Sequence, residues 1–439
     1  MKRVFGLLST LCLASLLALP VSGSAQSCDP DKNGRNPCPT QLVRPPDSGL
    51  SAMGRIGREL FHDPLLSGSG RLSCASCHDP AAHYGPSAST IFALGGLDLR
   101  HSGRRTVPTL TYLERTPPFS IGPDNAVSEA APSVAPPTGM THTQKSANNT
   151  AGSAAAIVPQ GGLFWDARAD TLQEQATGPL YDLNEMASTP EIVAKRLRTG
   201  PAAKALLQIA GPAAEKSDTL LVAEAMFALA RYQMEDSAFH PYSSRYDKWL
   251  EGKSAFSPQE SRGYRLFNDP AKGNCAACHV DTVGPDHLPP LFTDHQYEAL
   301  GVPANLQHAG KSHSDLGLCE SGRVETQGQK AYCGFFSTPT LRNASTRDHF
   351  FHNGVYSTLR QVIDFYVLRD TQPERIYPLG KDGQPQKYND LPKEYHANVD
   401  IMDAPFDRHA GDRPALSVSE REDIIAFLKT LEDAPYSSR

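Results

Sequence analysis

The stretch CASCH at residues 74–78 and the stretch CAACH at residues 275–279 share the pattern Cys-x-x-Cys-His. This pattern is the attachment signature of c-type haem, in which two thiols bond to the haem and the adjacent histidine binds its iron. A structural zinc site would instead need four thiolates from short spacings, and these pairs are far apart. The sequence therefore predicts two covalently bound c-type haems. The attachment residues are Cys74, Cys77 and His78 for the first haem, and Cys275, Cys278 and His279 for the second.

The duplication extends beyond the haem motifs. The pattern Gly-x-x-Leu-Phe-x-Asp-Pro occurs at residues 57–64 and again at residues 263–270, ahead of each motif. Apolar residues at helical spacing precede the first copy, and the capping box Ser257-Pro-Gln-Glu260 opens the second. Each Asp-Pro pair should end its helix. We expect a mainly α fold of two cytochrome c-like domains, each with one covalently bound haem, and little β structure.

The domain limits follow from this repeat. We assign residues 26–245 to an N-terminal domain and residues 246–439 to a C-terminal domain. Further helices are expected at 218–234, at 358–368, and after a cap at Ser417. Residues 116–161 are rich in Pro, Ala, Ser, Thr and Gly, which predicts a long surface loop inserted in the first domain. The alternative is a flap over an access channel or a surface that docks a partner.

The N-terminus predicts export. Residues 1–25 hold two basic residues, a short apolar run and small residues before Gln26, as in a cleaved signal peptide, and no later segment is long and apolar enough to span a membrane. In a bacterium the destination would be the periplasm. An oxidising compartment favours disulfides between neighbouring cysteines, rather than four free thiols. The expected pairs are Cys28 with Cys38 and Cys319 with Cys333.

The charge of the chain excludes one class of partner. Removing Lys2 and Arg3 with the signal peptide leaves 40 basic side chains against 48 acidic ones, a net charge of −8. A chain with this excess of acidic side chains lacks the basic character of proteins that bind nucleic acid. It could attract a basic electron-donor protein, although many acidic proteins are simply soluble.

The segment at residues 161–187 is the place to look for acid–base chemistry. It contains Phe-Trp-Asp-Ala-Arg-Ala at 164–169, then Gln175, Gly178-Pro179 and Glu185. With Thr-Pro-Thr-Leu-Arg-Asn at 338–343 and Phe-His-Asn-Gly at 351–354, this stretch resembles the bacterial dihaem cytochrome c peroxidase and MauG family. The resemblance covers roughly residues 45–435, and the insertion is the main part outside it.

The resemblance implies a role for each of these residues. The first haem would react with peroxide and the second would handle electrons. His78 would be the proximal ligand of the first haem, Glu185 the distal acid–base residue, and Gln175 the amide beside it. Trp165 would lie between the haems and relay an electron. The alternatives are that Trp165 is a core aromatic residue and that Glu185 is a surface residue.

The second ligand of the second haem separates the subfamilies. Peroxidases of the family place a methionine fourteen residues after the histidine that matches His352, where this chain has Tyr366. MauG-like proteins also have a tyrosine there. A thioether raises the haem potential, whereas an anionic phenolate stabilises oxidised iron. We expect Tyr366 to bind this iron; the alternative is that Tyr366 only packs and Met402 binds.

Two further features of the family are less well matched here. Many of its peroxidases block the first haem with a histidine, for which His101 is the candidate; we expect it to be a surface residue. A calcium ion between the domains would take the side chain of Thr106, where the family has asparagine, and the carbonyls of Arg347 and His349.

Three functions remain open at this point. The first is a periplasmic peroxidase that reduces hydrogen peroxide to water, with His/Tyr ligation at the second haem and a high-valent state shared by both haems. Its electron donor would be a small cytochrome or a cupredoxin. The second is peroxide-dependent oxidation of a partner protein. The third is a non-catalytic dihaem electron carrier, against which Glu185 and an open first haem argue.

Overall fold

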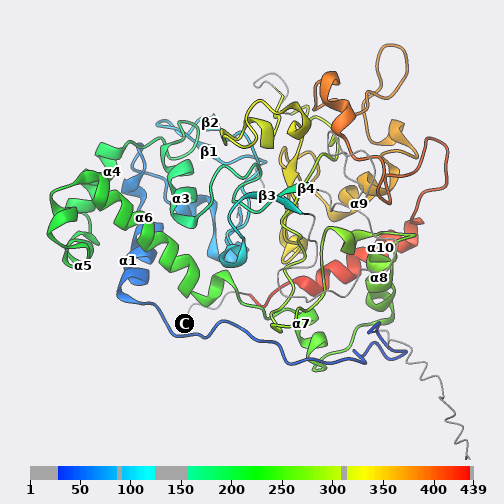
Figure 1. The fold of residues 1–439 in the computed structure, drawn as a ribbon, viewed down its shortest axis with the longest axis horizontal. Helices are drawn as coiled ribbons and strands as arrows, with labels where there is room; N and C mark the ends of the chain where they lie inside the picture. The colour runs from blue at the N-terminus through cyan, green and yellow to red at the C-terminus, as the bar shows by residue number, and fades with distance from the viewer. Residues whose placement is uncertain (1–27, 87–90, 124–156, 308–313, 436–439) are drawn as a thin grey trace, which may run out of the picture.

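The fold is mainly helical, with only short pieces of sheet (Figure 1). The computed structural model describes residues 28–86, 91–123, 157–307 and 314–435, and the predicted signal peptide lies outside them. The α-helices are α1 (Ala52–Phe61), α2 (Cys74–Cys77), α3 (Leu172–Tyr181), α4 (Pro190–Thr199), α5 (Ala203–Glu215), α6 (Asp218–Glu235), α7 (Arg245–Leu250), α8 (Pro258–Asn268), α9 (Leu359–Leu368) and α10 (Val418–Leu428).

Three antiparallel strand pairs complete the regular structure. They are β1 (Leu94–Gly95) with β2 (His101–Ser102), β3 (Ser120–Pro123) with β4 (Ile157–Gln160), and β5 (Tyr297–Glu298) with β6 (Phe336–Ser337). In the part of the chain that the structure describes, no helix is long and apolar enough to cross a membrane.

The helix starts follow the capping signals of the sequence. Ser257 and Ser417 each accept a hydrogen bond from the backbone three residues on, and Glu260 and Glu420 bond back, so both capping boxes form. The helices predicted at 218–234 and 358–368 appear as α6 and α9. These predictions are confirmed.

The duplication is visible in how the helices pack. Helix α1 crosses α6 at Gly57, and α8 crosses α10 at Gly263. At each glycine an added Cβ would overlap a backbone carbonyl of the partner helix, that of Ala228 or that of Asp423. Both glycines therefore permit a close helix crossing. Each crossing belongs to its own hydrophobic cluster, one around α1 and α6 and one around α8 and α10.

The first residues of the described chain pack on the second cluster (Figure 1). Leu42 is buried in that cluster, and the Thr40 amide donates to the Leu250 carbonyl at 2.9 Å. The Arg44 guanidinium pairs with Glu251 at 2.7 Å. The predicted N-terminal domain, residues 26–245, thus includes a segment whose contacts lie with the other half of the chain.

The insertion at 116–161 differs from a simple surface loop at its two ends. Strands β3 and β4 pair with each other over four residues, and Val158 is fully buried. Phe119 packs edge-on against Tyr297 with ring centroids 6.1 Å apart, so these ends anchor to the second half. Residues 124–156 lie outside the described part of the chain.

Candidate active site: two histidine centres

The first centre is built around His78, at the C-terminal end of α2. Its Nδ1 donates a hydrogen bond to the Tyr84 carbonyl at 3.1 Å. This bond leaves Nε2 as the nitrogen without a proton, which is the form that binds a metal. Burial lowers the pKa of His78 to about 4, so the ring is neutral at physiological pH. Phe61 packs edge-on against Tyr84 and supports the carbonyl that aligns the ring.

The second centre repeats this arrangement around His279. Nδ1 of His279 donates to the Phe292 carbonyl at 2.9 Å, and burial lowers the pKa of this ring to about 4 as well. Phe267 packs edge-on against Phe292 with centroids 6.1 Å apart, just as Phe61 packs on Tyr84. The two Leu-Phe pairs of the repeat thus support equivalent carbonyls.

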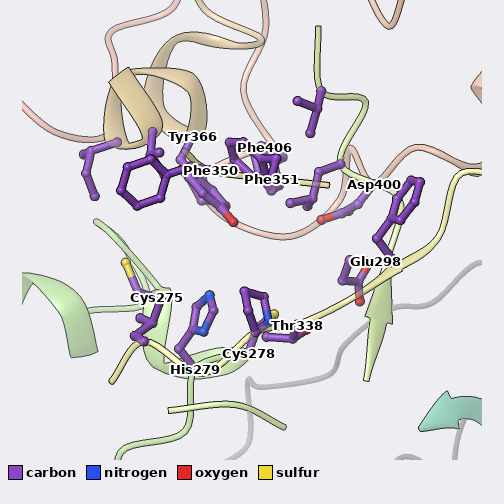
Figure 2. Close-up of a pocket in the computed structure, with 18 of the residues that line it drawn as sticks. Cys275, Cys278, His279, Glu298, Thr338, Phe350, Phe351, Tyr366, Asp400 and Phe406 are labelled. Carbon is purple, nitrogen blue, oxygen red and sulfur yellow. The ribbon is translucent and has the colours of Figure 1, made fainter. Parts of the chain in front are cut away.

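A cavity opens above His279 and is walled mainly by apolar side chains (Figure 2). Cys275, Cys278 and His279 lie on one wall, and Tyr366 from α9 lies on the opposite wall with its hydroxyl directed into the space. The ring of Tyr366 stacks on Phe406 with centroids 5.5 Å apart. Burial raises the pKa of the Tyr366 phenol, so without a cation the hydroxyl would stay protonated.

Met402, the alternative second ligand, lies elsewhere. It is 55% exposed and does not line the cavity that holds His279. Of the two candidates, only Tyr366 shares a cavity with the histidine.

Glu185 lies close to the first cysteine pair. Burial, and then the Glu185 carboxylate, raise the pKa of the Cys77 thiol to about 11. Burial also raises the pKa of Glu185 itself to about 7, with a contribution from Asp182 and an opposing one from Arg168. A carboxyl that titrates near neutral pH can both take up and release a proton.

Glu185 is held by the turn that follows α3. The Met186 amide donates back to the Pro179 carbonyl at 3.0 Å, and the Glu185 carbonyl accepts from the Gly96 amide at 2.8 Å. Gln175 is buried on the same helix. The segment singled out in the sequence therefore forms one compact unit.

Trp165 contacts both halves of the molecule. Its indole Nε1 donates to the Thr106 carbonyl at 3.2 Å, its own carbonyl accepts from the Ser337 amide at 3.0 Å, and its side chain lines the cavity of His279. A core aromatic residue that packed within one half of the chain would not contact the other half.

The surroundings of Trp165 contain an ion-pair network that we did not predict. Arg105 pairs with Asp166 at 2.6 Å and with Asp315 through two hydrogen bonds of 2.7 and 2.8 Å. Because Asp166 adjoins Trp165 and Asp315 lines the cavity, the network ties the tryptophan to the second centre. Asp166 lies in the Phe-Trp-Asp-Ala-Arg-Ala stretch singled out above, but no spacing in the sequence links it to Arg105 or Asp315.

A sequence signal for the two histidine loops was also missed. Pro-Thr-Leu occurs at 108–110 and at 339–341, and each threonine hydroxyl bonds to the loop that aligns a histidine. Thr109 donates to the His83 carbonyl at 2.9 Å, and Thr340 donates to the Leu291 carbonyl at 2.6 Å. The two copies lie at different distances from their motifs, which hides the repeat.

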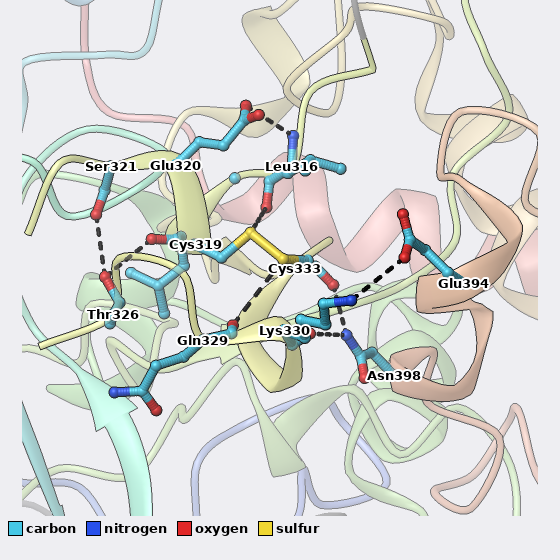
Figure 3. The surroundings of a disulfide bond; sticks show 12 residues. Leu316, Cys319, Glu320, Ser321, Thr326, Gln329, Lys330, Cys333, Glu394 and Asn398 are labelled. Atoms are coloured by element: carbon cyan, nitrogen blue, oxygen red, sulfur yellow. Dashed lines mark hydrogen bonds and ion pairs between the residues drawn. A yellow bond between two sulfur atoms is a disulfide. The ribbon is translucent and has the colours of Figure 1, made fainter.

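Both predicted disulfides form. Cys28 bonds to Cys38 and Cys319 bonds to Cys333, whereas the four cysteines of the haem motifs are free thiols. Figure 3 shows the second disulfide, which closes the loop from Cys319 to Cys333. Gly334 and Phe336, just after this loop, line the cavity of His279. Asn398 secures this loop through the Cys333 carbonyl, at 2.9 Å.

His101 lies on the surface, as expected. Its side chain is 55% exposed and its Nε2 is 3.6 Å from the Asp98 carboxylate. Thr106 donates its hydroxyl to the Phe351 carbonyl at 2.8 Å. Among the described residues no group of three or more His, Cys, Asp or Glu side chains is placed to hold a metal ion, and the calcium ion stays a prediction.

The two centres fit the covalent haems that their motifs predict. Each offers two free thiols and a neutral histidine whose Nε2 is available, and the second offers a largely apolar cavity. Thiols for covalent attachment and histidine for iron are the donors that c-type haem requires. The fold and the site together define a dihaem peroxidase class of protein.

Comparisons with known proteins agree with this class. The model of the family described as di-haem cytochrome c peroxidase matches residues 51–255. Methylamine utilization protein MauG of Paracoccus denitrificans is 31% identical over 98% of this chain and 97% of its own length. Cytochrome c551 peroxidase of Nitrosomonas europaea is 29% identical over 74% of this chain and 75% of its own length.

A solved structure gives the same result. The diheme peroxidase BthA from Burkholderia thailandensis superposes with a TM-score of 0.74 and 31% identity, covering 93% of each chain. The chain belongs to the dihaem cytochrome c peroxidase and MauG family, and it is an oxidoreductase of the peroxidase type.

Proposed function

We propose that this protein is a periplasmic peroxidase of two cytochrome c-like domains, each with one covalent c-type haem, that reduces hydrogen peroxide to water. The observation that carries the proposal is Glu185, a sheltered carboxyl beside the first cysteine pair whose pKa is raised to about 7. Iron held by His78 would supply the electrons that break the peroxide bond. The reaction consumes two electrons and two protons per peroxide and releases two waters.

Glu185 would move the proton. As a carboxylate it would accept a proton from one peroxide oxygen, and as a carboxylic acid it would return that proton to the other oxygen, which leaves as water. Buried Gln175 would add an amide to this pocket and limit where peroxide can lie. Partial burial keeps bulk water from competing for the same hydrogen bonds.

Trp165 would carry electrons between the centres, since it contacts both halves and lines the second cavity. Tyr366 would be the second ligand of the haem on His279. Because coordination to a ferric ion favours the phenolate, the bound tyrosine would lose the proton that burial otherwise retains.

A second candidate function is peroxide-dependent oxidation of a partner protein. Tyr366 favours it, since a phenolate disfavours reduction of the iron it binds and would make this centre a poor acceptor from ordinary electron donors. In that case the electrons would come from side chains of the partner rather than from a small cytochrome or cupredoxin.

Turnover with a reduced small c-type cytochrome distinguishes the two. We expect two equivalents of the cytochrome to be oxidised per hydrogen peroxide consumed, in many turnovers per enzyme. Glu185→Gln should slow this turnover, and the matched control is Glu215→Gln, which changes an exposed glutamate at the end of α5. If peroxide is consumed while the cytochrome remains reduced, the peroxidase proposal fails and oxidation of a partner protein takes its place.

A further inference from the structure

The loops that align His78 and His279 are each held from the other half of the chain. Arg347 lies directly after the short helix η8 (Ala344–Thr346) of the second half. It donates from Nη1 to the Ala82 carbonyl at 3.2 Å and from Nη2 to the His83 carbonyl at 3.4 Å. These carbonyls immediately precede Tyr84, which accepts the hydrogen bond of His78. Arg347 thus reaches the loop of the first centre.

Arg115 makes the reciprocal contact. It ends the short helix η3 (Leu113–Arg115) of the first half and donates from Nη1 to the Pro289 carbonyl at 2.6 Å. Pro289 lies three residues before Phe292, the acceptor for His279. Because η3 and η8 each follow a residue with a left-handed backbone, Tyr112 and Asn343, the two arginines occupy similar places in the repeat.

The two arginines differ in their acidic neighbours. Within the described ranges Arg347 forms no ion pair with a carboxylate, whereas Arg115 donates at 3.4 Å to the Tyr242 hydroxyl, which itself donates to the Glu114 carboxylate at 2.9 Å. Burial lowers the pKa of Arg347 to about 10, so it stays charged at neutral pH, and its charge acts on His78. Gly85 leaves the space that the Arg347 guanidinium fills, since an added Cβ there would overlap it.

We propose that Arg347 and Arg115 are reciprocal positioning residues, each holding from one half of the chain the loop that orients the iron-binding histidine of the other half. The inference rests on the proposed function, because it takes both histidines to bind haem iron. A fixed cation beside a haem favours the reduced iron, which carries less positive charge, and so raises its reduction potential. Each half would thereby influence the centre of the other.

The test is a spectroelectrochemical titration of both haems in the purified holoprotein. Arg347→Met should lower the potential of the first haem and change its electron paramagnetic resonance signal, leaving the second unchanged. Arg115→Met should do the same to the second haem alone. The change in reduction potential should be larger for Arg347→Met than for Arg115→Met. Arg347 contacts His83, next to the Tyr84 carbonyl that accepts from His78, whereas Arg115 contacts Pro289, three residues from the acceptor of His279.

Conservative variants separate charge from alignment. Arg347→Lys keeps the charge and should restore the potential, but it cannot span two carbonyls and should leave the altered resonance signal. Gly85→Ala should displace the Arg347 guanidinium from its two carbonyls and reproduce the altered resonance signal of Arg347→Met, even if Arg347→Met folds poorly. Exposed Arg55 and Arg375, changed to Met, are the matched controls in the two halves.

Two results would overturn the proposal. One is that both haems keep wild-type potentials and signals in Arg347→Met and Arg115→Met. The other is that each variant alters the haem of its own half. Absence of c-type haem from the wild-type protein would instead contradict the proposed function itself, so the two failures are distinguishable.

Discussion

His78 and His279 are held alike, yet they face different groups. Each donates Nδ1–H to a carbonyl backed by an aromatic ring of the Leu-Phe repeat. Near the first centre lies Glu185, whose pKa is about 7, and across the second cavity lies Tyr366. The repeated part of the fold thus provides two equivalent haem sites, and the unrepeated side chains give them different chemistry.

The largest expected effect comes from removing Glu185, the side chain that distinguishes the first centre from the second. Glu185→Gln keeps the shape of the side chain but cannot move a proton, so cleavage of hydrogen peroxide should slow by roughly 10²–10⁴-fold. Stopped-flow absorbance with hydrogen peroxide measures this step, and Glu215→Gln serves as the control. A Glu185→Gln enzyme with wild-type rates would remove this residue from the mechanism.

The pH dependence of the reaction with hydrogen peroxide should also depend on Glu185, with a smaller effect on the rate. Burial raises the pKa of Glu185 to about 7, so its carboxylate fraction falls as the pH drops below that value. If the carboxylate accepts the peroxide proton, the rate constant for peroxide should fall by about tenfold per pH unit below the pKa. Glu185→Gln should flatten this limb between about pH 5 and pH 8; a limb that persists would belong to another group.

Trp165 and Trp249 offer an internal comparison of the two tryptophans. Trp249 is 1% exposed and its Nε1 donates to the Gly34 carbonyl at 3.0 Å, within the second cluster. We expect Trp249→Phe to lower the free energy of unfolding by roughly 0.5–3 kcal/mol without affecting electron transfer. Trp165→Phe should slow electron transfer between the haems after a peroxide pulse, by less than Glu185→Gln slows cleavage. Equal transfer rates in both variants would contradict the relay.

The smallest expected effect concerns Met402. Because this residue is exposed and outside the cavity, Met402→Leu should leave the spectrum and potential of the second haem unchanged. Loss of the low-spin signal in this variant would make Met402 the ligand in place of Tyr366.

Local features of the fold were predictable because they depend on neighbouring residues. The capping boxes at Ser257 and Ser417, the paired cysteines and the haem motifs all act over short stretches of chain. Tyr366 was singled out by its place relative to a motif of the family, and its role as a ligand stays a prediction. That Tyr366 faces His279 across one cavity could only come from the folded chain.

Contacts between the halves were not predictable, because no spacing encodes them. The Arg105 pairs with Asp166 and Asp315 join segments far apart in sequence, and so does the contact from Arg115 to Pro289. The sequence likewise does not reveal that the segment around Leu42, which precedes the first haem motif, packs on the second cluster. Such contacts depend on the way the two repeats lie together.

The resonance spectrum of the oxidised resting protein at neutral pH tests the central asymmetry most directly. We predict one high-spin ferric haem, with its distal side open near Glu185, and one low-spin ferric haem bound by His279 and Tyr366. Tyr366→Phe should remove the low-spin signal and leave the high-spin one unchanged. Two low-spin haems in the wild type, or a low-spin signal unchanged in Tyr366→Phe, would contradict this account.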